Sequence, residues 1–485
     1  MNTSHKVRRD EGEKSMETRQ VVAVVLIVII IAGVGIGVWM FLPAAPYGAL
    51  VTGRLVTPGA PSGTPSDHII KVGLLGDTLG ITGQGNWKGA YMACDEINTA
   101  GGIEIDGETY YFGLVAEDTA EEEPQLDTAK GTTAATKIIT QDGAQFIMGG
   151  FRTEALLAYL EKVMDEDMLF INTGSATDIF TQHVAGGPWH QLVGPDVTSD
   201  YARYKYFFRV MPINSTTLIT SLFTYCAYLK GYLNATQGLN VTRVALLRED
   251  LDWTALMPTV LQYGLPSIGM ELVGDWAFPI DAEAADFETY WTQIEATDAQ
   301  ITVPVLSGSG GILMTTKYAQ LQPKCLLVGI NVAGQLDTYW NDTGGACQYE
   351  TILQAVHRTA KTTKTIAFWD DFIENFGGEP LYTAVGAYDG LYMLAQAIEA
   401  AQSLVSADIV PYLEAINTTN PYIGAGGTTA FTYTHDLFAG KTFSYTLLCQ
   451  WQAGGTKVVV PTGNLIYSDT VVTGSLTTPS WGINP

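Results

Sequence analysis

Positively charged residues are scarce in this sequence. Lys and Arg together number 25 against 50 Asp and Glu, which gives the 485-residue chain a formal net charge of −25 at pH 7. Nucleic acids and anionic lipid surfaces attract proteins through a basic face, so we expect neither as a partner. The acidic residues are spread along the chain, the longest acidic run being Glu121–Glu123. This distribution predicts a well-solvated surface rather than an acidic tail.

Cysteine and histidine are also few. The five cysteines show no CxxC spacing, and none pairs with a histidine at a spacing typical of zinc sites, so no metal or other cofactor is expected. Their odd number leaves at least one thiol without a partner in the chain. Cys325 and Cys347 are the nearest pair and a possible disulfide in an oxidising exterior. The other three are Cys94, Cys226 and Cys449.

No catalytic motif stands out. The sequence has no Gly-x-Ser-x-Gly nucleophile elbow, and GSGGIL at residues 308–313 lacks the third glycine of GxGxxG and the Lys-Ser/Thr of a phosphate loop. Hydrophobic residues make up 47% of the chain and aromatic residues 11%. That composition excludes a disordered protein and allows two or three folded domains. We therefore expect a folded protein that is not an enzyme.

Only one long hydrophobic run is present, the uncharged segment Val21–Leu42. As a helix it would span about 33 Å, enough for the ~30 Å hydrocarbon core of a bilayer. Residues 1–20 carry five basic side chains, which favours a cytoplasmic head. These are Lys6, Arg8, Arg9, Lys14 and Arg19. The sequence therefore predicts a single-pass signal anchor in the cell membrane, with the large domain extracellular; cleavage as a signal peptide is the alternative.

Residues 43–68 are rich in proline and glycine and have no apolar period, so they are predicted to be a flexible linker. Beyond them, five N-x-S/T sequons are compatible with glycosylation of a surface protein. The asparagines are Asn214, Asn234, Asn240, Asn341 and Asn417.

From residue 69 onward, short apolar runs alternate with segments of helical period. Strands are predicted at 69–75, 110–115, 144–148 and 168–171, and again at 242–247, 271–274, 301–306 and 326–329. Long helices are expected at 366–376 and 382–400, and an alternating strand at 443–451. This alternation is typical of parallel sheets covered by helices on both faces, and its repetition predicts two α/β lobes.

Function is expected in the segments that follow the strands, because open parallel sheets bind ligands at the C-terminal ends of their strands. These segments are rich in Gly, Ser and Thr, whose free N–H and hydroxyl groups suit an acceptor or anionic group. They are residues 76–85, 149–154, 172–177, 248–253, 307–311 and 329–334. Arg152 lies within one of them; a surface charge is favoured there, and a place near the first-lobe binding loop is the alternative.

The stretch around the first of these segments, residues 70–107, resembles part of a known protein family. IKVGLLGDTLGITGQGNWKGAYMACDEINTAGGIEIDG, with its G–A…A–EIN–AGGI–G pattern, is similar to the start of type I periplasmic solute-binding proteins. The similarity is to those of the branched-chain amino acid (leucine/isoleucine/valine) receptor kind. INTGSATDIF, FRVMPINS and AVGAYDGLYMLAQAIEAA also resemble segments of that family. The resemblance covers about residues 69–460.

The resemblance implies a type I periplasmic-binding-protein fold, in which two Rossmann-like lobes with parallel sheets and three crossover segments close on a ligand. The first lobe would comprise residues 69–208 and 356–442, the second residues 209–355 and 443–470, and residues 471–485 would form a tail. Such proteins usually deliver solutes to the permease and ATPase subunits of an ABC importer, which is the function expected here. A ligand-sensing ectodomain that signals through a separate partner protein is the alternative.

The resemblance also implies ligand-binding positions. In the first lobe, a carboxylate or similar acceptor would meet Thr153 and the loop Ser175–Ala176–Thr177. In the second lobe, Trp253 would cover the ligand, and Asn331 stands where amino acid receptors of the family have an acid for the ammonium. We expect a small polar solute (an amino acid, an amide or similar), with a free amino acid disfavoured because that acid is missing. The remaining candidates are Gln84, Ser309 and Tyr388.

Overall fold

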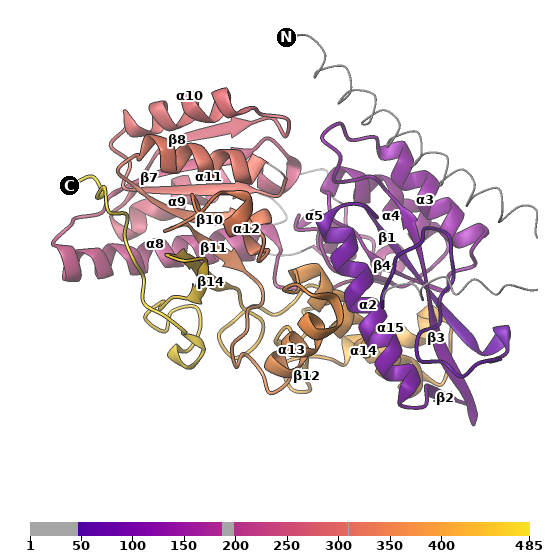
Figure 1. Ribbon diagram of the computed structural model, residues 1–485. Helices are drawn as coiled ribbons and strands as arrows, with labels where there is room; N and C mark the ends of the chain where they lie inside the picture. Colours follow the sequence, from indigo (N-terminus) through magenta and orange to yellow (C-terminus); the bar gives the residue numbers. More distant parts are fainter. Residues whose placement is uncertain (1–46, 187–197, 309) are drawn as a thin grey trace, which may run out of the picture. The chain divides into compact units, whose positions relative to one another are not determined.

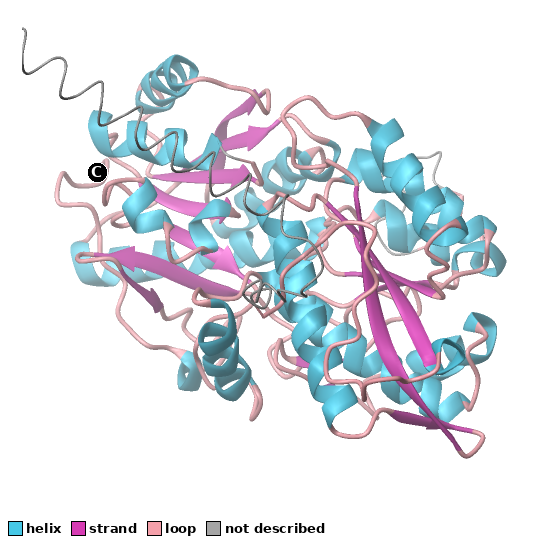
Figure 2. Cartoon of the chain, turned by 45° about the vertical axis from the view of Figure 1, so that its right-hand side comes forward, coloured by secondary structure: helices cyan, strands magenta, loops and turns pink. Residues whose placement is uncertain are grey.

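The computed structural model describes residues 47–186, 198–308 and 310–485. These residues form two α/β lobes, each built around its own sheet (Figure 1, Figure 2). The α/β class and the two lobes expected from the sequence are confirmed, but both sheets are mixed rather than purely parallel. The run Val21–Leu42 lies outside the described residues, and none of the helices within them is both long and apolar enough to cross a bilayer.

The first sheet has six strands in the order β2-β3-β1-β4-β5-β6. Neighbouring strands in this sheet run parallel, except that β2 pairs antiparallel with β3. The strands are β1 (Ile69–Gly76), β2 (Ile103–Ile105), β3 (Glu108–Asp118), β4 (Phe146–Gly149), β5 (Phe170–Asn172) and β6 (Phe207–Arg209). The helices of this lobe are α2 (Ile81–Thr99), α3 (Thr128–Thr140), α4 (Thr153–Asp165), α5 (Ile179–Val184), α7 (Tyr201–Tyr204), α14 (Tyr382–Ala401) and α15 (Ser406–Glu414).

The second sheet has seven strands in the order β15-β14-β11-β10-β9-β7-β8. It is mixed, because β14 and β15 are antiparallel to their neighbours. The strands are β7 (Arg243–Glu249), β8 (Glu271–Phe278), β9 (Ile301–Leu306), β10 (Leu326–Asn331), β11 (Thr351–Gln354), β14 (Leu447–Gln452) and β15 (Thr456–Val459). The helices are α8 (Ser215–Gln237), α9 (Met257–Gly264), α10 (Ala284–Glu295), α11 (Gly310–Leu321) and α12 (Tyr339–Asp342), with 3-10 turns η2 (Asp252–Thr254) and η4 (Ala333–Gln335).

The chain crosses back through α13 (Thr365–Phe376) to α14, which packs closely against α2. A Cβ atom on Gly89 of α2 would lie 1.9 Å from the carbonyl oxygen of Ala384 on α14, so only glycine permits this approach. The close crossing fixes the start of α14, where Tyr382 lines the pocket described below.

Residues 47–66 are packed on the first lobe and so differ from the flexible linker predicted there. The backbone of Val56 exchanges two hydrogen bonds with Leu114, on the part of β3 that β2 leaves unpaired (N···O 2.9 and 2.8 Å). The Trp87 indole N–H donates to the carbonyl of Gly48 at 2.7 Å. The segment was predicted to be flexible because its sequence has no apolar period. In the structure its backbone N–H and C=O groups find hydrogen-bond partners on the first lobe.

The possible disulfide between Cys325 and Cys347 is not formed, because all five cysteines are buried free thiols. Cys325 Sγ lies 3.2 Å from Thr302 Oγ1, whereas Cys347 belongs to a separate apolar cluster with Tyr339 and Trp451. Burial raises the pKa of each of these two thiols to about 12. They are therefore protonated at neutral pH and poor nucleophiles.

Among the sequon asparagines, Asn214 is unsuited to glycosylation because the fold uses both of its amide atoms. Its Oδ1 accepts from the backbone N–H of Thr217 at 2.6 Å, and its Nδ2 donates to Asp436 at 2.9 Å. The other four asparagines are exposed or half-buried. Glycosylation at those four stays a prediction.

Candidate ligand-binding site between the lobes

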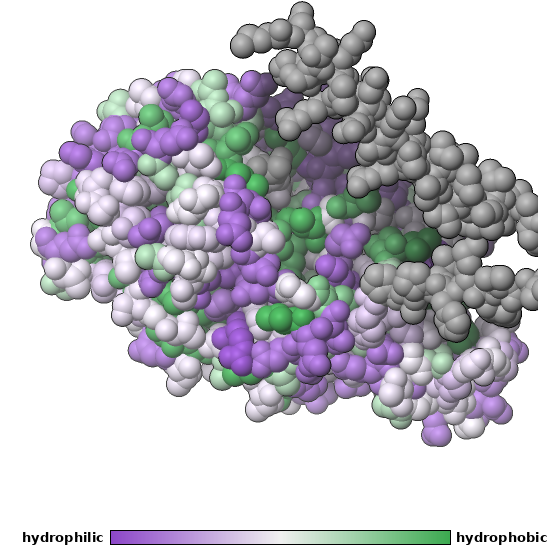
Figure 3. Space-filling model, in the orientation of Figure 1, coloured by the Kyte–Doolittle hydropathy of each residue, from purple (hydrophilic) through white to green (hydrophobic). Residues whose placement is uncertain are grey.

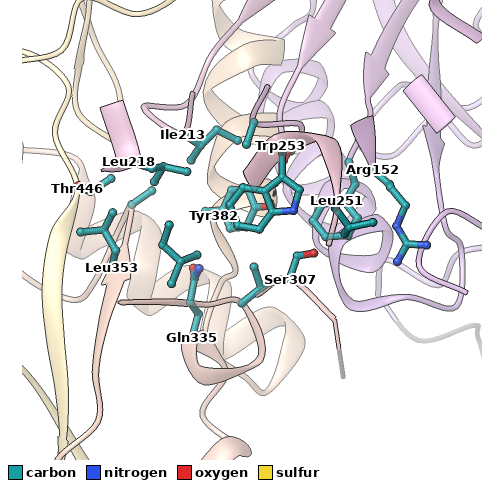
Figure 4. Close-up of a pocket in the computed structure, with 16 residues that line it drawn as sticks. Arg152, Ile213, Leu218, Leu251, Trp253, Ser307, Gln335, Leu353, Tyr382 and Thr446 are labelled. Atoms are coloured by element: carbon teal, nitrogen blue, oxygen red, sulfur yellow. Dashed lines mark hydrogen bonds between the residues drawn. The ribbon is translucent and has the colours of Figure 1, made fainter. Parts of the chain in front are cut away.

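A pocket lies between the two lobes (Figure 4). Its walls include the segments that follow β4, β5, β7, β9 and β10, at the C-terminal strand ends where parallel sheets bind ligands. Figure 3 shows hydrophobic residues, in green, gathered in the hollow between the lobes. The lining residues are Phe151, Arg152, Gly174, Ala176, Ile213, Leu218, Leu251, Trp253, Ser307, Ile330, Val332, Gln335, Leu353, Ala355, Tyr382 and Thr446.

Most of this lining is apolar, and three of the five polar side chains that it contains besides the Trp253 indole already have partners. Ser307 Oγ donates to Glu249 at 2.7 Å, and the Tyr382 hydroxyl donates to the carbonyl of Gly174 at 3.1 Å. Thr446 Oγ1 donates to Ser221 at 3.3 Å. The other two, Arg152 and Gln335, each have a buried polar atom without a hydrogen-bond partner in the part of the chain that the structure describes.

Arg152 is the one cationic side chain among the lining residues. The sequence predicted a surface charge there, but the residue is only 4% exposed. Its Nη1 donates to the backbone carbonyl of Glu123 at 2.8 Å, and its Nε has no partner among the described residues. A buried guanidinium with an unused N–H is a ready site for a carboxylate.

The first-lobe wall is held from behind by Arg209, the last residue of β6, whose side chain is fully buried. Its Nη1 donates to the carbonyl of Ala176 at 3.3 Å and lies 3.2 Å from Asp436 Oδ2, and its Nη2 donates to the carbonyl of Thr177. Sequence reasoning missed this pair, because 227 positions separate its members. The ion pair therefore fixes the loop that carries Ala176 into the pocket.

Several backbone N–H groups that were expected to meet a ligand are occupied by the chain's own glutamates. Glu121, part of the run predicted to be solvated, is fully buried and accepts from the backbone N–H groups of Phe151 and Arg152. Burial raises the pKa of Glu121 to about 8. Glu249 likewise accepts from Gly308 N at 2.7 Å. These N–H groups are therefore structural rather than free for an anion.

The structure brings some of the predicted site residues together. Ala176 and Trp253 line the pocket. Thr153 and Ser175 are sequence neighbours of lining residues, and their hydroxyls are both buried and without a partner among the described residues. Ser309 lies outside the described residues.

Three other candidates do not line the pocket. The Tyr388 hydroxyl donates to Glu96 at 2.6 Å, on the side of α14 that packs against α2. The Gln84 side chain donates to the carbonyl of Thr78 within its own loop. The Thr177 hydroxyl accepts, at 3.5 Å, from the N–H of Ile179 at the start of α5.

Asn331 does not face the cleft, and the reason is the alternation of side chains along β10. Its neighbours Ile330 and Val332 line the pocket, so Asn331 points to the opposite face of the sheet. There its amide donates to Glu350 at 2.9 Å and to the Tyr339 hydroxyl at 2.7 Å. The sequence predicted that Asn331 follows a strand of the second sheet but could not show which face of the sheet its side chain joins.

Two hydrogen bonds fix the turn η2, which carries Trp253. The backbone N–H of Asp252 donates to Glu154, on α4 of the first lobe, at 3.0 Å. Ser215 Oγ, at the start of α8, donates to the carbonyl of Trp253 at 2.7 Å. The indole is therefore positioned by contacts that depend on both lobes, as expected for a side chain that covers a ligand on closure.

Comparisons with known proteins agree with this arrangement. The family model described as periplasmic binding protein matches residues 69–456. Comparison with curated proteins gives no match. The solved structure of LivJ from Streptococcus pneumoniae in complex with isoleucine is similar, at 19% identity and a TM-score of 0.63, over 80% of this chain and 97% of that one.

Two further solved structures are similar over nearly their whole length. The leucine-binding protein LivK from Thermotoga maritima has 15% identity and a TM-score of 0.62, over 80% of this chain and 97% of that one. A solute-binding protein of an ABC transporter from Rhodopseudomonas palustris, in complex with p-hydroxybenzoic acid, has 14% identity and a TM-score of 0.62, over 81% and 95%. The chain belongs to the periplasmic binding protein family and has its type I fold, as the resemblance predicted.

Glu350 accepts a hydrogen bond from Asn331 on the face of the sheet away from the pocket, and its burial there can be tested by the pH dependence of stability. Burial raises the pKa of Glu350 from 4.5 to about 7, so the folded state binds more protons than the unfolded state between these values. Its contribution to stability is fully present below about pH 4.5 and is lost as pH rises through about 7, by up to roughly 3 kcal/mol. Urea unfolding at about pH 5 and pH 8 should show a smaller loss in Glu350→Gln than in the parent protein.

The exposed Glu108→Gln serves as the matched control and should keep the parent's pH dependence. An equal pH dependence in Glu350→Gln and the parent would contradict the burial assigned to this carboxyl.

Proposed function

We propose that the protein captures a small carboxylic acid with an apolar body between its lobes and delivers it to an ABC importer. The observation that carries the proposal is the buried Arg152 guanidinium, which has an unused N–H in an otherwise apolar pocket. Leaving such a group unpaired costs about 1–3 kcal/mol or more, and a ligand carboxylate would offset that cost. The unpartnered hydroxyl of Thr153 follows it directly in the chain, and that of Ser175 lies between the lining residues Gly174 and Ala176; both can donate to the same group.

The apolar lining favours a less polar ligand than the sequence suggested. Trp253, Leu251, Ile330 and Val332 provide flat and branched hydrophobic surface, which suits an aromatic or branched body. None of the described lining residues is acidic, so a ligand ammonium would find no carboxylate among them. Of the two ligands named above for similar solved structures, p-hydroxybenzoic acid meets these conditions better than isoleucine.

Calorimetric titration with p-hydroxybenzoate, benzoate and isoleucine tests this assignment. The parent protein should bind the two aromatic acids more tightly than isoleucine. Arg152→Met should weaken aromatic acid binding by roughly tenfold to hundredfold, since a hydrogen bond to a charged group is lost. The exposed Arg358→Met removes the same formal charge outside the pocket and should leave the affinity unchanged.

Tighter binding of isoleucine than of either aromatic acid would contradict the ligand class. Equal affinities of Arg152→Met and the parent would remove Arg152 from the site.

We also propose that the uncharged run Val21–Leu42 anchors the protein in the cell membrane with the folded part outside. The support is the charge asymmetry of the sequence, with basic residues concentrated before the run. Only residues 43–46 separate this run from Tyr47, whose hydroxyl donates to Asp95 on α2 at 2.9 Å. An anchored receptor of this kind would present captured solute to a permease in the same membrane.

Protease added to intact cells should degrade the folded part of the full-length protein, because that part is external. A chain beginning at Tyr47 should no longer sediment with membranes, whereas the full chain should. Complete protection of the full chain in intact cells, with digestion only after lysis, would contradict the orientation.

A further inference from the structure

Gln335 is a polar pocket residue that neither the composition nor the family pattern singled out. It ends the 3-10 turn η4, three residues after Val332, which lines the same pocket. Its side chain is only 5% exposed, and Oε1 is buried with no hydrogen-bond partner among the described residues. Figure 4 shows its amide pointing into the space between Leu353 and Ser307.

The backbone of Gln335 is fixed while its amide is not used. The carbonyl accepts from Lys457 Nζ at 2.5 Å, and the N–H donates to the carbonyl of Val332 at 3.1 Å. Lys457 is also within 2.9 Å of Glu379, in the segment that leads into α14. The amide is thus presented to the pocket from a rigid turn, and a buried carbonyl oxygen without a partner carries a free-energy cost.

No donor among the described residues meets this oxygen, because Ser307, Tyr382 and Thr446 each donate elsewhere and the Trp253 indole N–H makes no hydrogen bond to it. Arg152 belongs to the other lobe and lies on the far side of Trp253 and Leu251 from Gln335 in Figure 4. The pocket therefore has one unused cationic donor on one wall and one unused neutral acceptor on the other, with apolar surface between them.

We infer that the Gln335 amide is a specificity-determining group, which accepts a hydrogen bond from a neutral donor on the ligand, such as a hydroxyl, remote from the ligand's carboxylate. The inference rests on the proposed function, because the carboxylate is what orients the ligand with its far end toward the second lobe. A neutral donor is required because the described lining residues offer no carboxylate to an ammonium. Bonds at both ends would also favour the closed arrangement of the lobes, since each end belongs to a different lobe.

A matched ligand pair isolates this bond. p-Hydroxybenzoate and p-methylbenzoate have nearly the same shape, and only the first can donate from its para position. The parent protein should bind p-hydroxybenzoate more tightly by roughly tenfold to hundredfold, because the methyl compound leaves the amide unpaired. In Gln335→Leu the preference should vanish or reverse, with p-methylbenzoate bound at least as tightly as by the parent.

The exposed Gln262→Leu is the matched control variant, since it removes the same amide outside the pocket; it should keep the parent's preference. Thermal unfolding without ligand checks folding, and Gln335→Leu should match or exceed the parent's Tm because an unpaired buried amide is removed. Equal binding of the two probes by the parent protein overturns the role of Gln335 and leaves the proposed function standing. Binding of neither probe overturns both.

Discussion

The pocket depends on a buried ion pair between Arg209 and Asp436, which lie far apart in the sequence and meet behind the first-lobe wall. Removing one partner of a buried pair leaves an uncompensated charge, at a cost of about 3–5 kcal/mol. Here the guanidinium also donates to the carbonyls of Ala176 and Thr177, which fixes the loop that carries Ala176. Asp436 in turn accepts from Asn214 at the start of α8, so one charge pair aligns the wall with the chain's first passage to the second lobe.

The fold was predictable because its information is local and periodic. The alternation of apolar runs and helical segments predicted both sheets, and the expected helix 382–400 coincides with α14 to within one residue. Residues 47–66 were mispredicted because their stability comes from backbone pairing with β3, which leaves no apolar period in the sequence. The strand expected at 443–451 begins only at Leu447 in β14, since alternation alone does not show where pairing with β11 starts.

The site was only partly predictable, because it depends on which way each side chain points. Trp253 and Ala176 follow strands and line the pocket, as expected from the strand-end rule. Asn331 also ends a strand, yet the strand's alternation turns it to Glu350. Arg152 was expected on the surface, and Gln335 gave no signal at all, because burial without a partner is a property of the assembled lobes.

The most direct test of the central claim is a crystal structure of the protein purified with its natural ligand, supported by mass spectrometry of that ligand. The account predicts density for a flat or branched apolar acid against Trp253, with its carboxylate at Arg152 and a hydroxyl or similar donor at Gln335. A free amino acid in the pocket, with its ammonium paired to a carboxylate, would contradict the account. So would a ligand bound outside the interlobe pocket.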